Sequence, residues 1–390
     1  MIKLKSIIKI AFVNIFFIYV VLYSFEIYFQ IKNNNLFKIT PYHRFAKISK
    51  NQEFMPAIKP THLKDNYLNE IVPVSVVSNK KTLLCMDGDE PMHFKSDIHG
   101  FDNEILKKKV DLILIGDSYA AGHCVSQENR FYHQFKKKDL DIINFGMGGN
   151  GPLLMFASMV EFAKISDYET IVWFVTPDND YDDFEREVQN PILKKYLNSN
   201  FTQNLLTKKD EKDKLYFDYF KGLNRSPFKE FLYQYHLNLK LLRKKIKIAV
   251  KSKSPKHIKS HNSYFNILSR IRNNPNTVNS INHILKNLKN YADDNNKNLL
   301  IVYNLLHPEI LFNKSKSGLK KDLEENRNFL KKEGISFFDF SDYILKNYDQ
   351  SNIDKIMKNT GKNNWDHYTN EGYRLLTEQI AIKVKNMQNK

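Results

Sequence analysis

Short apolar segments alternate with amphipathic segments along most of the chain, and this alternation constrains the fold more than any other feature. The apolar segments have the length and composition of buried strands, and the others have apolar residues at helical spacing. The expected strands are 110–116, 140–145, 169–176, 298–306 and 335–340. The expected helices are 127–138, 151–165, 280–297, 320–334 and 369–386. Strands that alternate with helices form βαβ units, so we expect an α/β fold with a doubly wound, mostly parallel sheet.

The segments outside this pattern suggest the domain boundaries. Residues 32–105 lack strong periodicity and carry scattered Pro, Asn and Lys, which predicts an irregular arm packed on the core. The core domain then covers 106–390, with a helical insertion at about 183–275 where the alternation stops. Within the insertion, the segment 237–260 combines Leu and Ile at helical spacing with many basic residues. Such a segment could rest on an anionic membrane or glycan, although an ordinary surface helix is the more common explanation.

The first 31 residues have the composition of a membrane anchor. The run Ile10–Phe25 contains no charged residue, three lysines precede it, and the apolar character continues past Glu26. The stretch therefore approaches the roughly 20 residues that span a bilayer. Because no cleavage site of small residues follows, we expect an uncleaved signal anchor rather than a removed signal peptide. Asn14 and Glu26 interrupt the apolar character, which leaves a buried core helix as the alternative.

The charge distribution bears on orientation and on partners. The N-terminal lysines favour a cytoplasmic N-terminus, which places the long domain after the anchor in the periplasm or outside the cell. The formal net charge of +17 favours anionic lipid headgroups or acidic glycans as neighbours. We find no zinc-type cysteine spacing, phosphate-binding Walker loop or nucleic-acid module, so we expect no metal, no cofactor and no nucleic-acid partner.

Three loops with informative residues follow consecutive strands at one edge of the expected sheet. Gly116-Asp117-Ser118 ends the first strand, a glycine-rich loop follows the second, and Asn179 follows the third. Ligands of such sheets bind beyond the carboxyl ends of the strands. Near the other end of the chain, His367 lies just before the last expected helix. A serine hydroxyl is a poor nucleophile until an imidazole accepts its proton, so Ser118 and His367 are a candidate catalytic pair.

In this order, the motifs resemble the SGNH, or GDSL-type, family of esterases and acyltransferases over residues 110–182 and 295–386. The resemblance implies a flavodoxin-like fold, with Ser118 as the nucleophile and His367 as the general base. It also implies an oxyanion hole formed by the backbone N–H groups of Ser118 and Gly149 and the side-chain amide of Asn179. Each such donor typically contributes about 10²–10³ in rate. The anchor and the insertion indicate a membrane-anchored bacterial branch of this family.

The resemblance is incomplete at the carboxylate that orients the histidine. The family places an aspartate two or three residues before the histidine, and Trp365 and Asn364 occupy these positions here. Asp366 is the nearest carboxylate, which makes it the third candidate catalytic residue. Neighbouring side chains seldom point the same way, so a Ser–His dyad oriented by Asn364 or by a backbone carbonyl remains an alternative. We expect Asp117 to be a structural turn residue.

The chain contains two cysteines, Cys85 and Cys124. An exported location would allow them to form a disulfide, and such a bond would brace the loop after Ser118. Two unpaired thiols are an equally good interpretation.

These features predict a serine ester hydrolase or O-acyltransferase that acts through an acyl-enzyme on an exported ester, linked to a glycan or a lipid. The alternative is a non-catalytic SGNH-like module that binds an acylated glycan or a partner in an envelope assembly. The altered aspartate spacing favours this alternative. The sequence does not determine the oligomeric state.

Overall fold

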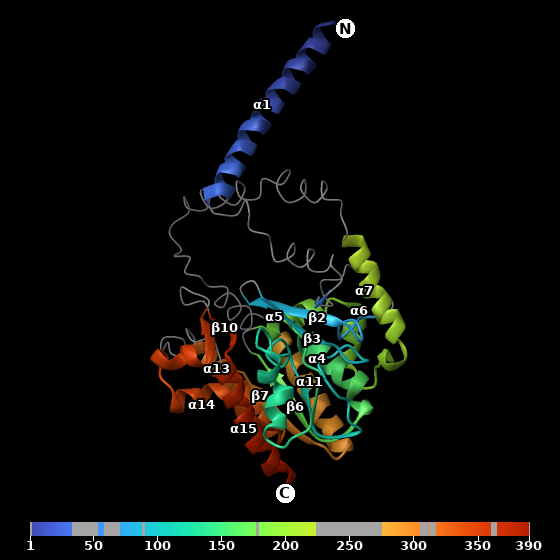
Figure 1. The fold of residues 1–390 in the computed structure, drawn as a ribbon, viewed down its shortest axis with the longest axis vertical. Helices are drawn as coiled ribbons and strands as arrows, with labels where there is room; N and C mark the ends of the chain where they lie inside the picture. The colour runs from blue at the N-terminus through green and yellow to red at the C-terminus, as the bar shows by residue number, and fades with distance from the viewer. Residues whose placement is uncertain are drawn as a thin grey trace. The chain divides into compact units, whose positions relative to one another are not determined.

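The computed structural model describes most of the chain (Figure 1). The described residues are 2–32, 54–57, 71–87, 90–176, 179–223, 275–304, 311, 317–359 and 365–389. The chain divides into two compact units. The larger comprises Asn51–Tyr219 and Ser263–Lys390, and the smaller comprises Met1–Lys50 and Phe220–Asn262.

A five-stranded parallel sheet forms the centre of the larger unit. Its strands are β4 (Lys109–Ile115), β5 (Ile142–Asn144), β6 (Asp167–Val175), β7 (Asn298–Tyr303) and β8 (Ser336–Asp339). They lie in the order β5-β4-β6-β7-β8, and every neighbouring pair is parallel. This order is that of flavodoxin-like, doubly wound folds, in which ligands bind where the strand order reverses. The expected α/β fold is confirmed, and the end of β4 lies at that reversal.

Helices surround this sheet, which explains why its strands are continuous apolar runs. The main helices of the core are α3 (Phe131–Lys136), α4 (Pro152–Phe162), α5 (Asp180–Glu187), α11 (Pro275–Asp294), α13 (Ser317–Lys332), α14 (Phe340–Asn347) and α15 (Asn370–Gln388). α3 packs on α15, whereas α4 packs on α5 and α11. Strands β4, β6 and β7 are buried along nearly their whole length, as in parallel sheets covered on both faces.

Local signals set the ends of two of these helices. The Oγ1 atom of Thr369 accepts a hydrogen bond from the backbone N–H of Gly372 at 3.1 Å, so Thr369 caps α15 as expected. Gly334 follows α13 with a φ of +65°, a conformation that glycine adopts without steric cost.

A β-hairpin lies where we expected part of an irregular arm. β2 (Lys81–Asp87) pairs antiparallel with β3 (Glu90–Lys95), and β1 (Met55–Pro56) lies parallel to β2. The segment 71–78 is buried, and the N–H of Val72 donates to Oε1 of Gln203 at 2.7 Å. The prediction of an irregular arm over 32–105 is therefore wrong for this part, which is a structured layer of the larger unit. Residues 33–53 and 58–70 lie outside the described residues.

The expected insertion at about 183–275 is described over its first part. It contains the end of α5, then α6 (Pro191–Lys194) and α7 (Lys209–Leu223). Helix α7 is attached to the buried segment 71–78, because Nζ of Lys212 donates to the carbonyl oxygen of Val76 at 2.7 Å. The basic segment 237–260 lies outside the described residues.

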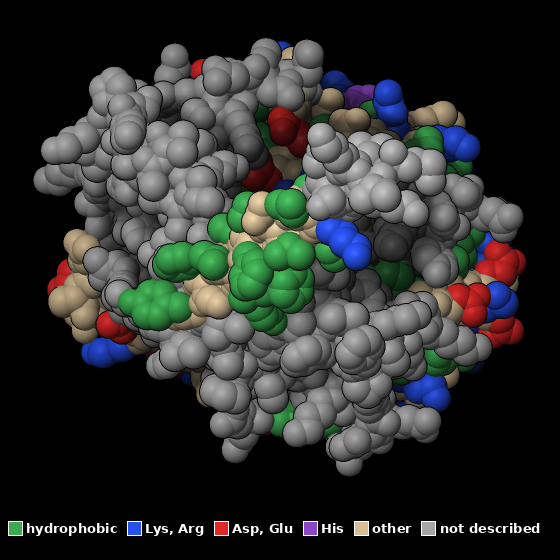
Figure 2. All heavy atoms as spheres, turned by 90° about the horizontal axis from the view of Figure 1, so that it is seen from above, with side chains coloured by type: hydrophobic (Ala, Val, Ile, Leu, Met, Phe, Trp, Pro, Cys, Tyr) green, Lys and Arg blue, Asp and Glu red, His purple; other side chains and the backbone are tan. Residues whose placement is uncertain are grey.

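The N-terminal segment is a single helix, α1 (Ile2–Lys32). Its stretch Lys9–Glu26 is long and apolar enough to cross a membrane. Large apolar side chains such as Phe12, Ile15 and Phe17 are exposed along it. Figure 2 shows exposed hydrophobic side chains in the view from above. An apolar surface of this kind is unusual in contact with water, because exposed hydrophobic patches are typical of membrane or protein contacts.

Candidate active site

Ser118 lies in a tight turn directly after β4. A Cβ atom on Gly116 would lie 2.7 Å from Cβ of Ala120 and 2.8 Å from Cβ of Phe174, so only glycine fits where the strand ends. The backbone N–H of His123 donates to the carbonyl oxygen of Ser118 at 3.1 Å, which closes the turn. Ser118 is therefore held at the carboxyl edge of the sheet, where its side chain is half-buried.

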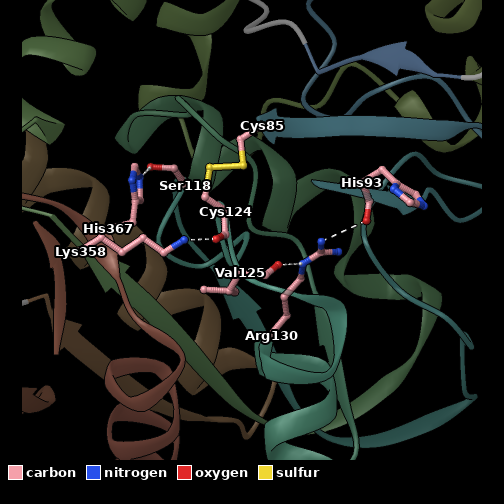
Figure 3. Close-up of a disulfide and its surroundings, with 8 residues drawn as sticks. All are labelled: Cys85, His93, Ser118, Cys124, Val125, Arg130, Lys358 and His367. Carbon is pink, nitrogen blue, oxygen red and sulfur yellow. Dashed lines mark hydrogen bonds between the residues drawn. A yellow bond between two sulfur atoms is a disulfide. The ribbon is translucent and has the colours of Figure 1, made fainter. Parts of the chain in front are cut away.

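His367 reaches this turn from a second hairpin. β10 (Trp365–Tyr368) pairs antiparallel with β9 (Met357–Asn359). The Nε2 atom of His367 lies 2.7 Å from Oγ of Ser118, although the two residues are 249 positions apart (Figure 3). The structure thus brings the two candidate catalytic side chains within hydrogen-bond distance.

A chain of side-chain hydrogen bonds attaches the strand of His367 to the edge of the sheet. The hydroxyl of Tyr368 donates to Oδ1 of Asn304 at 3.2 Å, and Nδ2 of Asn304 donates to Oγ1 of Thr176 at 2.7 Å. Asn304 directly follows β7, and Thr176 directly follows β6. All three side chains are buried, so the two hydrogen bonds are shielded from water. They hold β10 in place at the edge of the sheet.

Asn179 follows β6 and begins α5 as its N-cap residue. Its Nδ2 atom donates to Oδ2 of Asp117 at 3.1 Å, while the N–H of Tyr119 donates to Oδ1 of Asp117 at 2.9 Å. Burial raises the pKa of the Asp117 carboxyl, and these two hydrogen bonds oppose that rise. Asp117 is therefore more than a turn residue, because it connects the Ser118 turn to the loop that carries Asn179.

The glycine-rich loop after β5 passes beside Ser118. The N–H of Met147 donates to the carbonyl oxygen of Gly116 at 3.1 Å, which holds the loop against the end of β4. A Cβ atom on Gly148 would lie 3.9 Å from Cβ of Ser118. Gly149 is buried and has a φ of +82°, a conformation that other residues adopt only with strain.

Asp366 and Asn364 are the two residues whose side chains the sequence offers for orienting His367. The side chain of Asp366 and the whole of Asn364 lie outside the described residues. The assignment of Asp366 as a catalytic residue therefore stays a prediction.

Two neighbours of His367 were not expected from the sequence. The ring of Tyr119 lies 4.7 Å from the imidazole of His367, measured between centroids, and the ring of His123 lies 4.5 Å from it. Both follow Ser118 in the same turn. Their proximity to His367 arises only when β10 reaches the turn.

Cys85 and Cys124 form a disulfide with their Cα atoms 5.6 Å apart (Figure 3). Of the two interpretations of the cysteines, the structure therefore has the bridged one. The two sulfur atoms and a ring nitrogen of His123 all lie within 4.8 Å of one another. Metal ions bind thiolates, however, and sulfurs that are bonded to each other are not thiolates. These three residues therefore do not offer a metal site while the disulfide is intact.

Buried carboxyl groups of α5 accept hydrogen bonds from the segments that follow β5 and β6. Glu187 accepts hydrogen bonds from the N–H groups of Gly151 and Leu153 at 2.6 and 2.9 Å, where α4 begins. Burial raises the pKa of Glu187 to about 8. Asp180 accepts a hydrogen bond from the N–H of Thr176 at 2.7 Å, and burial raises its pKa as well, with the charge of Asp117 adding to the rise. The ends of β5 and β6 are thus joined through α5.

No model of a known protein family matches the chain, and no curated protein matches it. Among solved structures, the chain is similar to the "Structure of a putative lipolytic protein of G-D-S-L family from Desulfitobacterium hafniense DCB-2". The two are 12% identical with a TM-score of 0.35, over 71% of this chain and 99% of that chain.

Proposed function

We propose that this protein is a serine ester hydrolase or O-acyltransferase that works through an acyl-enzyme at Ser118. The observation that carries the proposal is the distance of 2.7 Å between Nε2 of His367 and Oγ of Ser118. A nucleophile and its base need this separation for proton transfer during attack. The position of the pair at the carboxyl edge of a parallel sheet supports the same assignment, since substrates bind there.

The reaction follows from the chemistry of the pair. Oγ of Ser118 attacks the ester carbonyl carbon while Nε2 of His367 accepts the hydroxyl proton, which gives a tetrahedral intermediate with a negative oxygen. Collapse of the intermediate breaks the ester bond, and His367 returns the proton to the departing alcohol. Water or a sugar hydroxyl then attacks the acyl-serine, again with His367 as the base. This second attack releases an acid or an acylated acceptor.

The negative oxygen needs donors aimed at it, and we assign them to the backbone N–H groups of Ser118 and Gly149 and to the amide of Asn179. The amide carries two N–H groups, and one of them donates to Asp117. The second remains available to the substrate oxygen. The passage of the glycine-rich loop beside Ser118 supports a role for Gly149, since a backbone donor must approach the substrate closely.

The orienting group of His367 can be identified by mutation. If Asp366 holds the imidazole, Asp366→Ala lowers activity as much as His367→Ala. A mild loss in Asp366→Ala assigns the orientation to another group and makes the site a dyad.

We further propose that the substrate is an exported ester linked to a glycan or a lipid and that α1 anchors the enzyme in the membrane. The apolar stretch of α1 supports the anchor. The net charge of +17 supports an anionic neighbour such as a lipid headgroup or an acidic glycan. The large domain would then face the periplasm or the exterior.

Labelling with a fluorophosphonate tests the proposal, because this reagent reacts with serines that are activated as nucleophiles. We expect the full-length chain in detergent to be labelled and Ser118→Ala and His367→Ala to remain unlabelled. Ser126→Ala, a nearby serine whose hydroxyl donates to Glu128, should be labelled like the wild type. In hydrolysis of p-nitrophenyl acetate, the wild type and Ser126→Ala should be active, and Ser118→Ala and His367→Ala should be inactive. A folded wild-type chain that neither reacts nor turns over would support the non-catalytic binding module instead.

A further inference from the structure

Besides the bond between His367 and Ser118, the hairpin β9–β10 makes a hydrogen bond to the Ser118 loop through Lys358. Met357 pairs with Tyr368, so Lys358 on β9 and His367 on β10 lie at neighbouring positions of the hairpin. His367 meets the side chain of Ser118, and Nζ of Lys358 donates a hydrogen bond to the carbonyl oxygen of Cys124 (Figure 3). Both bonds end in the same loop. The distance from the base to the nucleophile therefore depends on how firmly this loop and this hairpin are joined.

Cys124, whose carbonyl oxygen accepts the hydrogen bond of Lys358, is also attached to β2. Cys124 is bonded through its sulfur to Cys85 on β2. Its φ is +58°, in the left-handed region that few residues other than glycine adopt. A backbone in this region needs surrounding contacts to persist, and the disulfide and the Lys358 hydrogen bond supply two of them.

The residue after Cys124 is fixed as well. Nε of Arg130 donates to the carbonyl oxygen of Val125 at 3.2 Å, and Nη2 of Arg130 donates to the carbonyl oxygen of His93 on β3 at 3.0 Å (Figure 3). Arg130 is buried and paired with Asp102 at 3.0 Å, so this attachment is rigid. The β2–β3 hairpin thus holds the end of the loop both covalently and through hydrogen bonds.

We propose that Lys358 is a positioning residue for the reaction at Ser118, and that the Cys85–Cys124 disulfide acts with it. We call these three residues the clamp. This inference rests on the proposed function. The physical reason is that a hydrogen bond from an ammonium group to a carbonyl is roughly twice as strong as one between neutral groups, and catalysis is sensitive to displacements of about 1 Å. Without the clamp, the Ser118 loop and the hairpin β9–β10 each keep their fold. Nε2 of His367 then lies within hydrogen-bond distance of Oγ of Ser118 for a smaller fraction of the time.

The clamp makes activity sensitive to reduction. A dithiol reductant would open the disulfide by thiol–disulfide exchange, so that Cys85 and Cys124 become thiols and the reductant becomes a disulfide. The lysine would then bind a carbonyl whose backbone is less constrained. An exported location, where disulfides persist, suits such a device.

The experiment compares Lys358→Met, Lys358→Arg and Lys383→Met in the full-length chain. Methionine keeps the length of the side chain and removes the donor, arginine keeps a charged donor, and Lys383 is an exposed residue of α15 that serves as a charge-matched control. The measurements are the rate of fluorophosphonate labelling, kcat and KM with p-nitrophenyl acetate, and the thermal midpoint. We expect Lys358→Met to lower the labelling rate and kcat about ten- to a hundredfold, with KM and the thermal midpoint close to wild type. Lys358→Arg should recover most of the loss.

A second arm tests the disulfide. The Cys85→Ser/Cys124→Ser variant should show a lower kcat than the wild type, and a dithiol should lower kcat of the wild type to the same level without affecting the variant. A chelator is present throughout, because freed thiols near His123 could bind metal ions. The inference is overturned if Lys358→Met labels as fast as Lys383→Met, or if arginine restores nothing. Failure of the wild type to label at all would instead refute the proposed function.

Discussion

Nδ2 of Asn179 donates a hydrogen bond to Oδ2 of Asp117 at 3.1 Å, across 62 positions of sequence. This bond joins the loop after β6 to the residue that precedes Ser118. Because the carboxylate holds one N–H of the amide, it determines the direction of the other. Oδ1 of Asn179 has no hydrogen-bond partner among the described residues, so no competing bond turns the amide away. Asp117 thus orients an oxyanion donor in the proposed mechanism.

A double-mutant cycle tests this role of Asp117. Asn179→Ala removes a donor, so we expect kcat to fall about a hundredfold or more. Asp117→Ala should lower kcat to a similar extent, because it releases the amide. The double variant should lose little more than either single variant, since both changes remove one interaction. Asp117 also accepts a hydrogen bond from the N–H of Tyr119, and Asp117→Ala removes this bond too. The thermal midpoint of each variant therefore has to be measured, to show that the loss of activity is not a loss of folding. Losses of activity that add in the double variant would show that the two residues act separately.

Much of the fold could be predicted from the sequence because buried parallel strands are distinctive. A run such as VDLILI is apolar at nearly every position. Because a helix connects each such strand to the next, the strands run parallel and their carboxyl ends lie at one edge of the sheet. The loops of Ser118, Gly149 and Asn179 could be placed at this edge for the same reason. The β2–β3 hairpin was not predicted, although Gly88-Asp89, a residue pair typical of two-residue hairpin turns, stands between its strands in the sequence.

The contacts of Lys358, Tyr119 and His123 could not be predicted, for a different physical reason. Lys358 is one of many lysines, and its contact with Cys124 depends on the pairing of two very short strands, β9 and β10. Pairing between such short strands leaves no periodic pattern in the sequence. The proximity of His123 to His367 likewise depends on the folded loop rather than on spacing.

Two neighbouring glycines provide a matched test of the loop beside Ser118. Gly149 has a φ of +82°, so Gly149→Ala should lower the free energy of unfolding by about 1–2 kcal/mol. The same change should lower kcat by displacing a proposed oxyanion donor. Gly148→Ala places its Cβ at ordinary contact distance, 3.9 Å from Cβ of Ser118, so its effect on stability should be smaller. Chemical denaturation and ester hydrolysis measure the two effects. Equal stability of both variants would show that the left-handed backbone is not needed at position 149.

The apolar helix α1 can be tested as a membrane anchor. Phe16 and Phe17 are exposed near the middle of the stretch Lys9–Glu26. Phe16→Lys/Phe17→Lys introduces two charges at the centre of a bilayer, at about 2.5–3.5 kcal/mol each. We expect the wild type to stay in membranes washed with alkaline carbonate and the variant to be extracted. Leu345→Lys, at an exposed position of α14, should behave like the wild type. Extraction of the wild type would contradict the anchor.

The buried Glu187 predicts how stability depends on pH. Burial raises the pKa of Glu187 in the folded protein to about 8, whereas the ordinary pKa of the side chain is 4.5. Between these values the folded state binds one proton more than the unfolded chain, so stability falls as the pH rises through this window and levels off above it.

Relative to Glu187→Gln, the wild type should therefore lose a few kcal/mol of unfolding free energy between about pH 5 and pH 8. Urea denaturation at several pH values measures this difference, and Glu185→Gln on the same helix controls for the loss of charge. A difference that does not change with pH would mean that the carboxylate is ionised throughout. The hydrogen bonds from the N–H groups of Gly151, Leu153 and Leu154 would then lower the pKa of Glu187 more than its burial raises it. In that case α5 would join the two loops of the site through a permanent charge at the start of α4, where the helix dipole favours it.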